Sequence, residues 1–348
     1  MESNEQVIQK LGPTHMTRAL VFDETGDPAQ VLRVKDVPLP TPGSGEVRVR
    51  MLAAPINPSD LLFIRGQYGR RPELPGTAGF EGAGVVEEAG PGLLGRMRVG
   101  RRVAVLHGRG GSWQEYAIVP SRQVVPVPRA LPDEQAACFF VNPATALIMT
   151  RSVLRVPRDR WLLQSAAGSA LGRMIIQLGK HYGFRTMNVV RRREQADELK
   201  ALGADAVICT QDEQIEKRVM ELTKGEGVPY AIDSVGGATG SALVRSLGHR
   251  GRMIVYGTLA EEPLQFDSRL LVVGQKRLEG FWLSEWTREQ GTVTMLRLFK
   301  KLARLMTTGV IATNIGKSFG IDQFAEATRL AAEPGHQGKV LFRFQSSK

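Results

Sequence analysis

The chain has 348 residues, of which 42% are hydrophobic and 23% charged, a composition that indicates an ordered globular protein of about two domains. Its most apolar stretch, residues 136–149, is interrupted by asparagine, proline and threonine, so no run approaches the roughly 20 apolar residues needed to cross a bilayer. The composition excludes a disordered, collagen-like or membrane-spanning chain and predicts a soluble protein.

The chain is basic: 46 lysines and arginines against 35 aspartates and glutamates give a net charge of +11. The positive residues are spread along the sequence, with local clusters at 96–102, 151–160 and 191–193. Such a surplus suits a nucleic acid, a polyphosphate cofactor or an acidic carrier protein. Only 6% of the residues are aromatic, and none form a stripe between basic residues, which disfavours a nucleic-acid-binding function.

The cysteine content and the N-terminal sequence both indicate the cellular compartment in which the protein is found. The two cysteines, Cys138 and Cys209, form no CxxC pair, as expected in a reducing environment. Residues 1–15 contain two glutamates, one lysine and no arginine, which matches neither a transit peptide nor a secretory signal. We therefore expect a cytoplasmic protein with an N-terminal extension over residues 1–16.

The first large segment, residues 17–132, is predicted to be a small antiparallel β-rich unit. Short runs that alternate apolar and polar residues are separated there by glycine and proline. Strands are expected at 18–22, 46–51, 84–87 and 102–106. After them the pattern becomes helical, with Asp133 as the expected N-cap of a helix that continues through residues 136–154.

The middle of the chain alternates strands with helices of about ten residues, a pattern typical of a doubly wound parallel sheet. The expected strands are 161–164, 185–190, 207–209, 230–233 and 251–256, and the expected helices are 171–182, 193–202, 214–223 and 240–247. A helix over 292–308, a segment at 319–332 and a strand at 339–344 complete the chain. The predicted architecture is α/β, with the β-rich domain over 17–132 and 300–348 and the doubly wound domain over 133–299.

A loop rich in small residues follows the first strand of the doubly wound domain. Residues 165–172 read Ser-Ala-Ala-Gly-Ser-Ala-Leu-Gly, a composition that lets backbone amides and a helix N-terminus approach a pyrophosphate. The loop departs from a strict GxGxxG, since Ala170 stands at the middle glycine position. Its place between a strand and a helix nevertheless predicts a dinucleotide site.

The second strand of this domain ends in Arg191, Arg192 and Arg193 rather than in an acidic residue. An acidic residue would bind the ribose 2′-hydroxyl of NAD, whereas guanidinium groups favour the 2′-phosphate of NADP. The triplet therefore predicts NADPH as the cofactor. Two further segments, residues 233–237 and Tyr256 with Gly257, follow later strands and are expected to face the same crevice.

Several catalytic motifs are absent from the sequence. There is no GxSxG, no HExxH and no set of cysteines and histidines with zinc-ligand spacing. The five histidines are scattered along the chain. We therefore expect a bound cofactor to carry the chemistry, assisted by a weak acid such as tyrosine.

With these features together, the chain resembles the medium-chain dehydrogenase/reductase superfamily from residue 17 to residue 344, which implies a GroES-like catalytic domain beside a Rossmann domain. Zinc-dependent members carry cysteine and histidine ligands where this sequence has Asn57 and Phe80. The resemblance therefore implies a zinc-free member with no metal site. Asp60 and Glu81, next to these positions, are assigned no chemistry.

Within the zinc-free branch, local motifs resemble the mitochondrial-type trans-2-enoyl-thioester reductases. They are Ile56–Asp60, Gly66–Gly69 with Pro72–Pro75, Val141–Thr145, Asn188–Arg191 and Gly280–Trp286. The resemblance implies that Tyr68 is the catalytic acid; a phenol with its ordinary pKa near 10 is protonated at neutral pH. The cofactor-binding residues expected from the loop, the strand ends and the resemblance are Asn142, Gly168, Ser169, Ala170, Leu171, Gly172, Arg191, Arg192, Arg193, Tyr256, Gly257, Phe281, Trp282, Leu283, Ser284 and Lys339.

The expected function is NADPH-dependent reduction of the C2=C3 double bond of 2-enoyl thioesters carried on CoA or acyl carrier protein. The first alternative is the reduction of quinones or alkenals on the same fold. The second and less favoured alternative is that the chain is an NADPH-binding protein whose partner is a nucleic acid. Small-molecule or carrier-bound substrates are expected as partners, without nucleic acid or membrane. The resemblance also implies a homodimer, since members of the superfamily commonly pair through the edge strands of their Rossmann domains, and residues 251–258 and 264–273 supply apolar edge material here.

Overall fold

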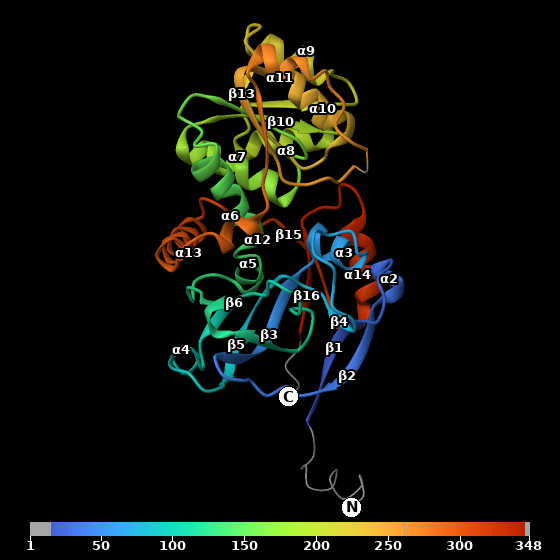
Figure 1. The fold of residues 1–348 in the computed structure, drawn as a ribbon, viewed down its shortest axis with the longest axis vertical. Helices are drawn as coiled ribbons and strands as arrows, with labels where there is room; N and C mark the ends of the chain where they lie inside the picture. Colours follow the sequence, from blue (N-terminus) through green and yellow to red (C-terminus); the bar gives the residue numbers. More distant parts are fainter. Residues whose placement is uncertain (1–14, 261, 345–348) are drawn as a thin grey trace, which may run out of the picture. The chain divides into compact units, whose positions relative to one another are not determined.

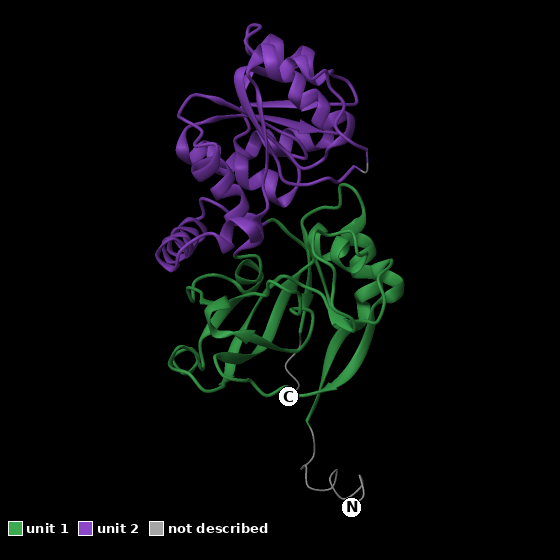
Figure 2. Ribbon diagram, in the orientation of Figure 1, with its two compact units in different colours: residues 1–139, 314–348 green, residues 140–313 purple. Residues whose placement is uncertain are grey.

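The computed structural model describes residues 15–260 and 262–344, so most of the predicted N-terminal extension lies outside the described residues. The chain divides into two compact units (Figure 2). Unit 1 comprises the residues up to Phe139 and those from Asn314 onward, and unit 2 comprises Phe140–Thr313. The chain thus leaves unit 1 once, builds unit 2, and returns (Figure 1). No helix in the described ranges is long and apolar enough to span a membrane.

Unit 1 is built mainly of antiparallel strands, which confirms the β-rich prediction. One sheet has the order β2-β1-β4, and the other follows the path β15-β16-β3-β5-β6-β8, with β7 also paired to β3. The strands are β1 (Met16–Phe22), β2 (Arg33–Pro38), β3 (Glu46–Pro55), β4 (Gly76–Thr77), β5 (Glu81–Ala89), β6 (Arg102–Leu106), β7 (Tyr116–Pro120), β8 (Val124–Pro126), β15 (Ile315–Phe319) and β16 (Lys339–Arg343). The C-terminal strand β16 pairs with β3, which ties the returning chain to the N-terminal sheet.

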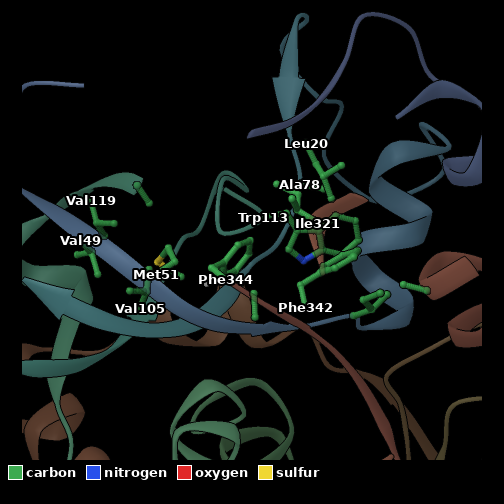
Figure 3. Packing of buried hydrophobic residues seen from close by; sticks show 14 of the residues in the cluster. Leu20, Val49, Met51, Ala78, Val105, Trp113, Val119, Ile321, Phe342 and Phe344 are labelled. Atoms are coloured by element: carbon green, nitrogen blue, oxygen red, sulfur yellow. The ribbon is translucent and has the colours of Figure 1, made fainter. Parts of the chain in front are cut away.

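The helices of unit 1 are short and lie between these strands. They are α2 (Pro28–Val31), α3 (Pro58–Ile64), α4 (Leu93–Arg96), α5 (Asp133–Ala137) and α14 (Phe324–Ala332), with 3-10 turns at η1 (Ser121–Gln123) and η3 (Ile321–Gln323). The core beneath them is apolar and continuous between the N-terminal and C-terminal strands (Figure 3). Trp113 is fully buried there, its ring centroid 5.1 Å from that of Phe342, and its Nε1 donates to the Pro55 carbonyl. The indole is therefore buried without an unsatisfied donor.

Unit 2 contains a six-stranded parallel sheet with the order β11-β10-β9-β12-β13-β14. Counted along the chain this is the order 3-2-1-4-5-6 of the Rossmann fold, which confirms the doubly wound prediction. The strands are β9 (Trp161–Gln164), β10 (Arg185–Val190), β11 (Ala206–Cys209), β12 (Val228–Asp233), β13 (Leu247–Val255) and β14 (Arg277–Gly280). The side chains of the central strands β9, β10 and β12 are mostly buried, as in other two-sided parallel sheets, whereas β14 at the edge has no buried side chain.

The helices of unit 2 are α6 (Val141–Ile148), the π-helix η2 (Met149–Val153), α7 (Ala170–Tyr182), α8 (Glu194–Leu202), α9 (Ile215–Leu222), α10 (Gly237–Ser246), α11 (Arg269–Gly274), α12 (Leu283–Arg288) and α13 (Thr292–Thr307). Of these, α7 to α11 connect successive strands of this sheet, whereas α6 and η2 precede β9 and α12 and α13 follow β14. Helix α7 packs against α6 and α8, and α9 packs against α10. Gly183 ends α7 in the left-handed conformation that favours glycine, with its amide donating to the Gly179 carbonyl.

The prediction of a single helix across residues 133–154 is wrong. The structure has α5, α6 and η2 instead, and unit 1 ends between α5 and α6. Pro143, the third residue of α6, lacks an amide and would clash with the preceding turn of a continuous helix. Asp133 does not cap α5 either; its carboxylate accepts a hydrogen bond of 2.6 Å from Arg102.

Candidate active site

The turn between β9 and α7 brings the expected cofactor loop to the carboxyl edge of the sheet in unit 2. Ser169 is the N-cap of α7, and its hydroxyl accepts the Gly172 amide at 3.1 Å. A Cβ at Gly172 would lie 2.6 Å from the Ala167 carbonyl oxygen, so only glycine allows this approach of helix to strand. Ala170 begins the helix without disturbing the cap. The turn therefore presents the positive end of a 13-residue helix to an anion.

A buried hydrogen-bond network joins this turn to the end of β12. Ser165 donates to Asp233 Oδ1 at 2.5 Å and accepts the Ser234 amide at 3.0 Å. Asp233 also accepts the amides of Val235 and Gly236, which fixes the bend into α10. The network holds the ends of two neighbouring strands together beside the crevice. The sequence pattern indicates that residues 233–237 face the crevice. It does not indicate the hydrogen bond between Ser165 and Asp233, because these two residues are 68 positions apart.

The arginine triplet follows the end of β10 and is exposed. Arg193 forms an ion pair with Asp212, its Nη2 lying 2.8 Å from Oδ2. Arg191 stays on the surface, while its carbonyl accepts a weak hydrogen bond from the thiol of Cys209. Three guanidinium groups thus stand at the strand end where NAD-specific sites carry an acidic residue.

The other expected residues of unit 2 lie at the ends of β13 and β14 and at the start of α6. Gly257 follows β13, and a Cβ there would lie 3.0 Å from the Ser234 carbonyl. Burial raises the pKa of Tyr256 to about 12, so its hydroxyl stays protonated. After β14 comes Phe281, whose amide donates to the Val255 carbonyl. Trp282, Leu283 and Ser284 follow at the start of α12. Asn142 lies elsewhere in the unit, as the second residue of α6.

Tyr68 belongs to unit 1, in the loop that follows α3. Its ring lies 5.3 Å from that of Phe80, which in turn lies 5.2 Å from the ring of Phe63. The tyrosine is half-buried, and its ring packs against the apolar core of unit 1. Gly66, with φ +72°, makes the turn that leads from α3 to Tyr68.

Beside this aromatic group lies a buried polar network around Asn57, one of the two positions at which the resemblance implies zinc ligands in other members. Asn57 donates through Nδ2 to Glu81 Oε1 at 3.0 Å and accepts through Oδ1 from Lys339 Nζ at 2.8 Å. Asp60 accepts the amides of Asn57 and Phe80. Burial raises the pKa of Asp60 to about 7, although both amides and the nearby Lys339 lower it.

These residues do not fit a zinc ion. Both polar atoms of the Asn57 amide are already hydrogen-bonded, and the ammonium of Lys339 lies against its oxygen, where it would repel a dication. Phe80 offers no donor atom. In the described ranges, no group of three or more His, Cys, Asp or Glu side chains is placed to hold a metal.

The sequence pattern assigns no chemistry to Asp60 and Glu81 and places Lys339 among the cofactor residues. The structure places all three in unit 1, with the ammonium of Lys339 buried and hydrogen-bonded to Asn57. Lysine and asparagine are 282 positions apart, so no sequence spacing could have indicated this pair. The other expected cofactor residues belong to unit 2.

Two family models match the chain, and together they cover both units. The alcohol dehydrogenase GroES-like domain matches residues 43–129, and the domain described as zinc-binding dehydrogenase matches residues 170–301. The human mitochondrial enoyl-[acyl-carrier-protein] reductase is 34% identical over 93% of this chain and 88% of its own length. The chain belongs to the medium-chain dehydrogenase/reductase superfamily of oxidoreductases.

Within that superfamily, it is similar both to the mitochondrial enoyl-[acyl-carrier-protein] reductases and to structures described as quinone reductases. A Bacillus thuringiensis protein described as a "putative NADPH:quinone reductase" is 33% identical, with a TM-score of 0.90 over 95% of this chain and 100% of that one. A mycobacterial protein solved in complex with NADPH is 29% identical, with a TM-score of 0.86 over 94% of this chain and 100% of that one.

Proposed function

We propose that this protein is an NADPH-dependent reductase of the C2=C3 double bond of 2-enoyl thioesters. The observation that carries the proposal is the packing of the Tyr68 ring against Phe80, since the family resemblance implies a metal ligand of zinc-dependent members at the position of Phe80. The likeness to enoyl-[acyl-carrier-protein] reductases over 93% of the chain supports the same substrate class.

The cofactor is NADPH. Its pyrophosphate would be held by the turn from Gly168 to Gly172 and the N-terminus of α7, and its 2′-phosphate by Arg191, Arg192 and Arg193. When bound, it supplies the hydride that is transferred to the β-carbon of the substrate. Asn142, Tyr256, Gly257, Phe281, Trp282, Leu283, Ser284 and Lys339 complete the proposed cofactor-binding set.

Tyr68 is the proposed proton donor. Hydride addition at the β-carbon leaves negative charge on the α-carbon and the thioester oxygen, and the reaction is completed when the α-carbon receives a proton. The Tyr68 hydroxyl donates that proton, directly or through a water molecule, and water then restores the phenol. Its packing on Phe80 fixes the ring, so the proton is delivered from a defined position.

A second candidate function is the reduction of quinones or alkenals. The likeness to the Bacillus thuringiensis structure, with a TM-score of 0.90, favours it. Such a reaction also takes hydride from NADPH but places fewer demands on a specific acid. Under this alternative, Tyr68 is a packing residue of the loop after α3.

One experiment separates the two candidates. NADPH oxidation is followed with a crotonyl thioester, a quinone and an alkenal at equal concentrations. The proposal expects a kcat/KM for the crotonyl thioester at least tenfold above the other two. A higher kcat/KM with the quinone or the alkenal would replace the proposal with the alternative.

The proposal has three further parts. The carrier of the enoyl group is CoA or acyl carrier protein, the protein is located in the cytoplasm, and it assembles as a homodimer.

A further inference from the structure

Unit 1 contains a cavity of about 630 Å³ that the cofactor and Tyr68 do not account for. Its wall is formed by the loop that follows Tyr68, by β4 and by the turn after β6. Ligand pockets commonly have volumes of about 300–1,000 Å³, so the cavity is large enough for a small molecule or an extended arm. All of its lining residues belong to unit 1.

The charge of the lining is strongly positive. Arg70, Arg71 and Arg109 line the cavity, and Glu73 is the one carboxylate among the lining residues. The Glu73 carboxylate lies 3.8 Å from Arg109 and is exposed, so it neutralises at most one guanidinium. Arg70 donates to the Gly108 carbonyl at 2.9 Å, which holds its head group at the cavity wall. Guanidinium groups arranged in this way suit a phosphate.

His107 adds a buried acceptor to the same wall. Its Nε2 lies 3.1 Å from the Ile118 carbonyl oxygen, which can only accept, so Nε2 carries the hydrogen. Burial lowers the pKa of the ring and keeps it neutral, leaving Nδ1 as an acceptor. Nδ1 is buried and has no hydrogen-bond partner among the described residues. A buried unpaired acceptor is destabilising, and a ligand N–H or O–H donor that bonds to it removes this cost.

A glycine turn packs against the His107 ring, and both belong to the cavity lining. Gly111, with φ +125°, lies so close that a Cβ there would be 2.8 Å from His107 Cε1. Phe63 is also a lining residue, and its ring contacts Phe80, against which Tyr68 packs. Through Phe63 the cavity lining is in contact with the aromatic group that includes the proposed proton donor.

We propose that this cavity binds the phosphorylated pantetheine arm of the thioester, with Arg70, Arg71 and Arg109 on the phosphate and His107 Nδ1 accepting from an amide N–H or hydroxyl of the arm. The arm carries amide N–H groups and a hydroxyl along one chain, and a phosphate at its end, which matches the lining. The proposal rests on the enoyl-thioester function. CoA and acyl carrier protein both present this phosphorylated arm.

Binding is tested first without turnover, on the full chain saturated with NADP⁺ so that the cofactor site is filled. Calorimetric titration compares 4′-phosphopantetheine with pantetheine. We expect 4′-phosphopantetheine to bind at least tenfold tighter, and Arg70→Gln/Arg71→Gln to abolish that difference. Arg122→Gln/Arg129→Gln, which removes two exposed arginines of the same unit, should preserve it. Equal affinity of the wild-type protein for both probes would overturn the proposal.

Kinetics then separate this inference from the proposed function. Crotonyl-CoA, crotonyl acyl carrier protein and crotonyl-N-acetylcysteamine, which lacks phosphate, are compared. We expect Arg70→Gln/Arg71→Gln to raise KM about tenfold for both phosphorylated substrates, with kcat and the N-acetylcysteamine reaction unchanged. A KM increase with crotonyl-CoA alone, or an equal increase with all three, would overturn the inference. If no thioester is reduced while 4′-phosphopantetheine still binds more tightly than pantetheine, the proposed enoyl-reductase function is wrong but the phosphate-binding site is confirmed.

Discussion

Lys339 Nζ donates a hydrogen bond of 2.8 Å to Asn57 Oδ1, so a buried ammonium lies against the asparagine at one of the two positions where the family resemblance implies zinc ligands in other members. The same asparagine donates to Glu81, a carboxylate that is itself buried. The position is occupied by a buried polar network whose cation, Lys339, belongs to the chain. Buried carboxylates need such a partner, because an unpaired buried charge is strongly destabilising.

This network predicts independence from metal. We expect elemental analysis of the purified protein to find no stoichiometric zinc, and NADPH oxidation to continue at its full rate after dialysis against a chelator. A zinc-dependent dehydrogenase dialysed in parallel provides the control, since it should lose activity. One equivalent of tightly held zinc would contradict the conclusion that Asn57 and Lys339 leave no place for a metal ion.

The triplet after β10 predicts the cofactor preference. We expect NADPH to bind at least tenfold tighter than NADH, a difference of about 1.4 kcal/mol. Arg191→Ala/Arg193→Ala should remove most of this preference, because it removes two guanidinium groups available to the 2′-phosphate. The matched control is Arg297→Ala/Lys300→Ala, which changes two exposed residues of α13 and should leave the preference for NADPH unchanged. Fluorescence titration measures both affinities; equal values in the wild-type protein would refute the prediction.

The sequence predicts the regular parts of the fold more fully than the site. The alternation of strand-like and helix-like segments in the middle of the chain predicts a strand over 185–190, and the structure has β10 over those residues. The break between α5 and α6 escapes prediction because helix-compatible residues surround Pro143 on both sides. The bridge from Ser165 to Asp233 and the pair of Lys339 with Asn57 join distant segments, so only the folded chain brings them together.

Exposed apolar side chains on helix α11 lead us to expect that the protein forms a homodimer. Val272 and Val273 on this helix are 77% and 80% exposed, although valine is usually buried. We expect light scattering to give twice the chain mass of 38.2 kDa at micromolar concentration. Val272→Asp/Val273→Asp should produce monomers, because two charges in an apolar interface would be left desolvated. Val293→Asp, an exposed position on α13, should not. A monomeric wild-type protein would exclude the dimer.

Asp60 predicts a pH-dependent contribution to stability. Its pKa is about 7 in the folded protein because of burial, against about 3.9 in an unfolded chain. Between these values the folded state holds a proton that the unfolded state has lost, so the contribution of Asp60 to the free energy of unfolding falls as the pH rises from about 4 to about 7, by up to about 4 kcal/mol.

Urea unfolding at several pH values measures this effect. Asp60→Asn cannot titrate, so the free energy of unfolding of the wild-type protein, taken relative to the variant, should decrease across this range and level off above pH 7. Glu24→Gln, at an exposed position in the same unit, should run parallel to the wild-type protein at every pH. Parallel curves for Asp60→Asn would show that Asp60 does not hold a proton in the folded state.

The most direct test of the proposed function is turnover of the Tyr68→Phe variant with a 2-enoyl thioester. The substitution keeps the ring that packs on Phe80 and removes only the hydroxyl. We predict that kcat falls by about 10²–10⁴-fold, the usual contribution of a general acid, while NADPH affinity changes little. Tyr116→Phe, on β7 of the same unit, is the matched control and should retain wild-type turnover. Near-normal turnover of Tyr68→Phe would contradict its role as proton donor and favour the quinone-reductase alternative.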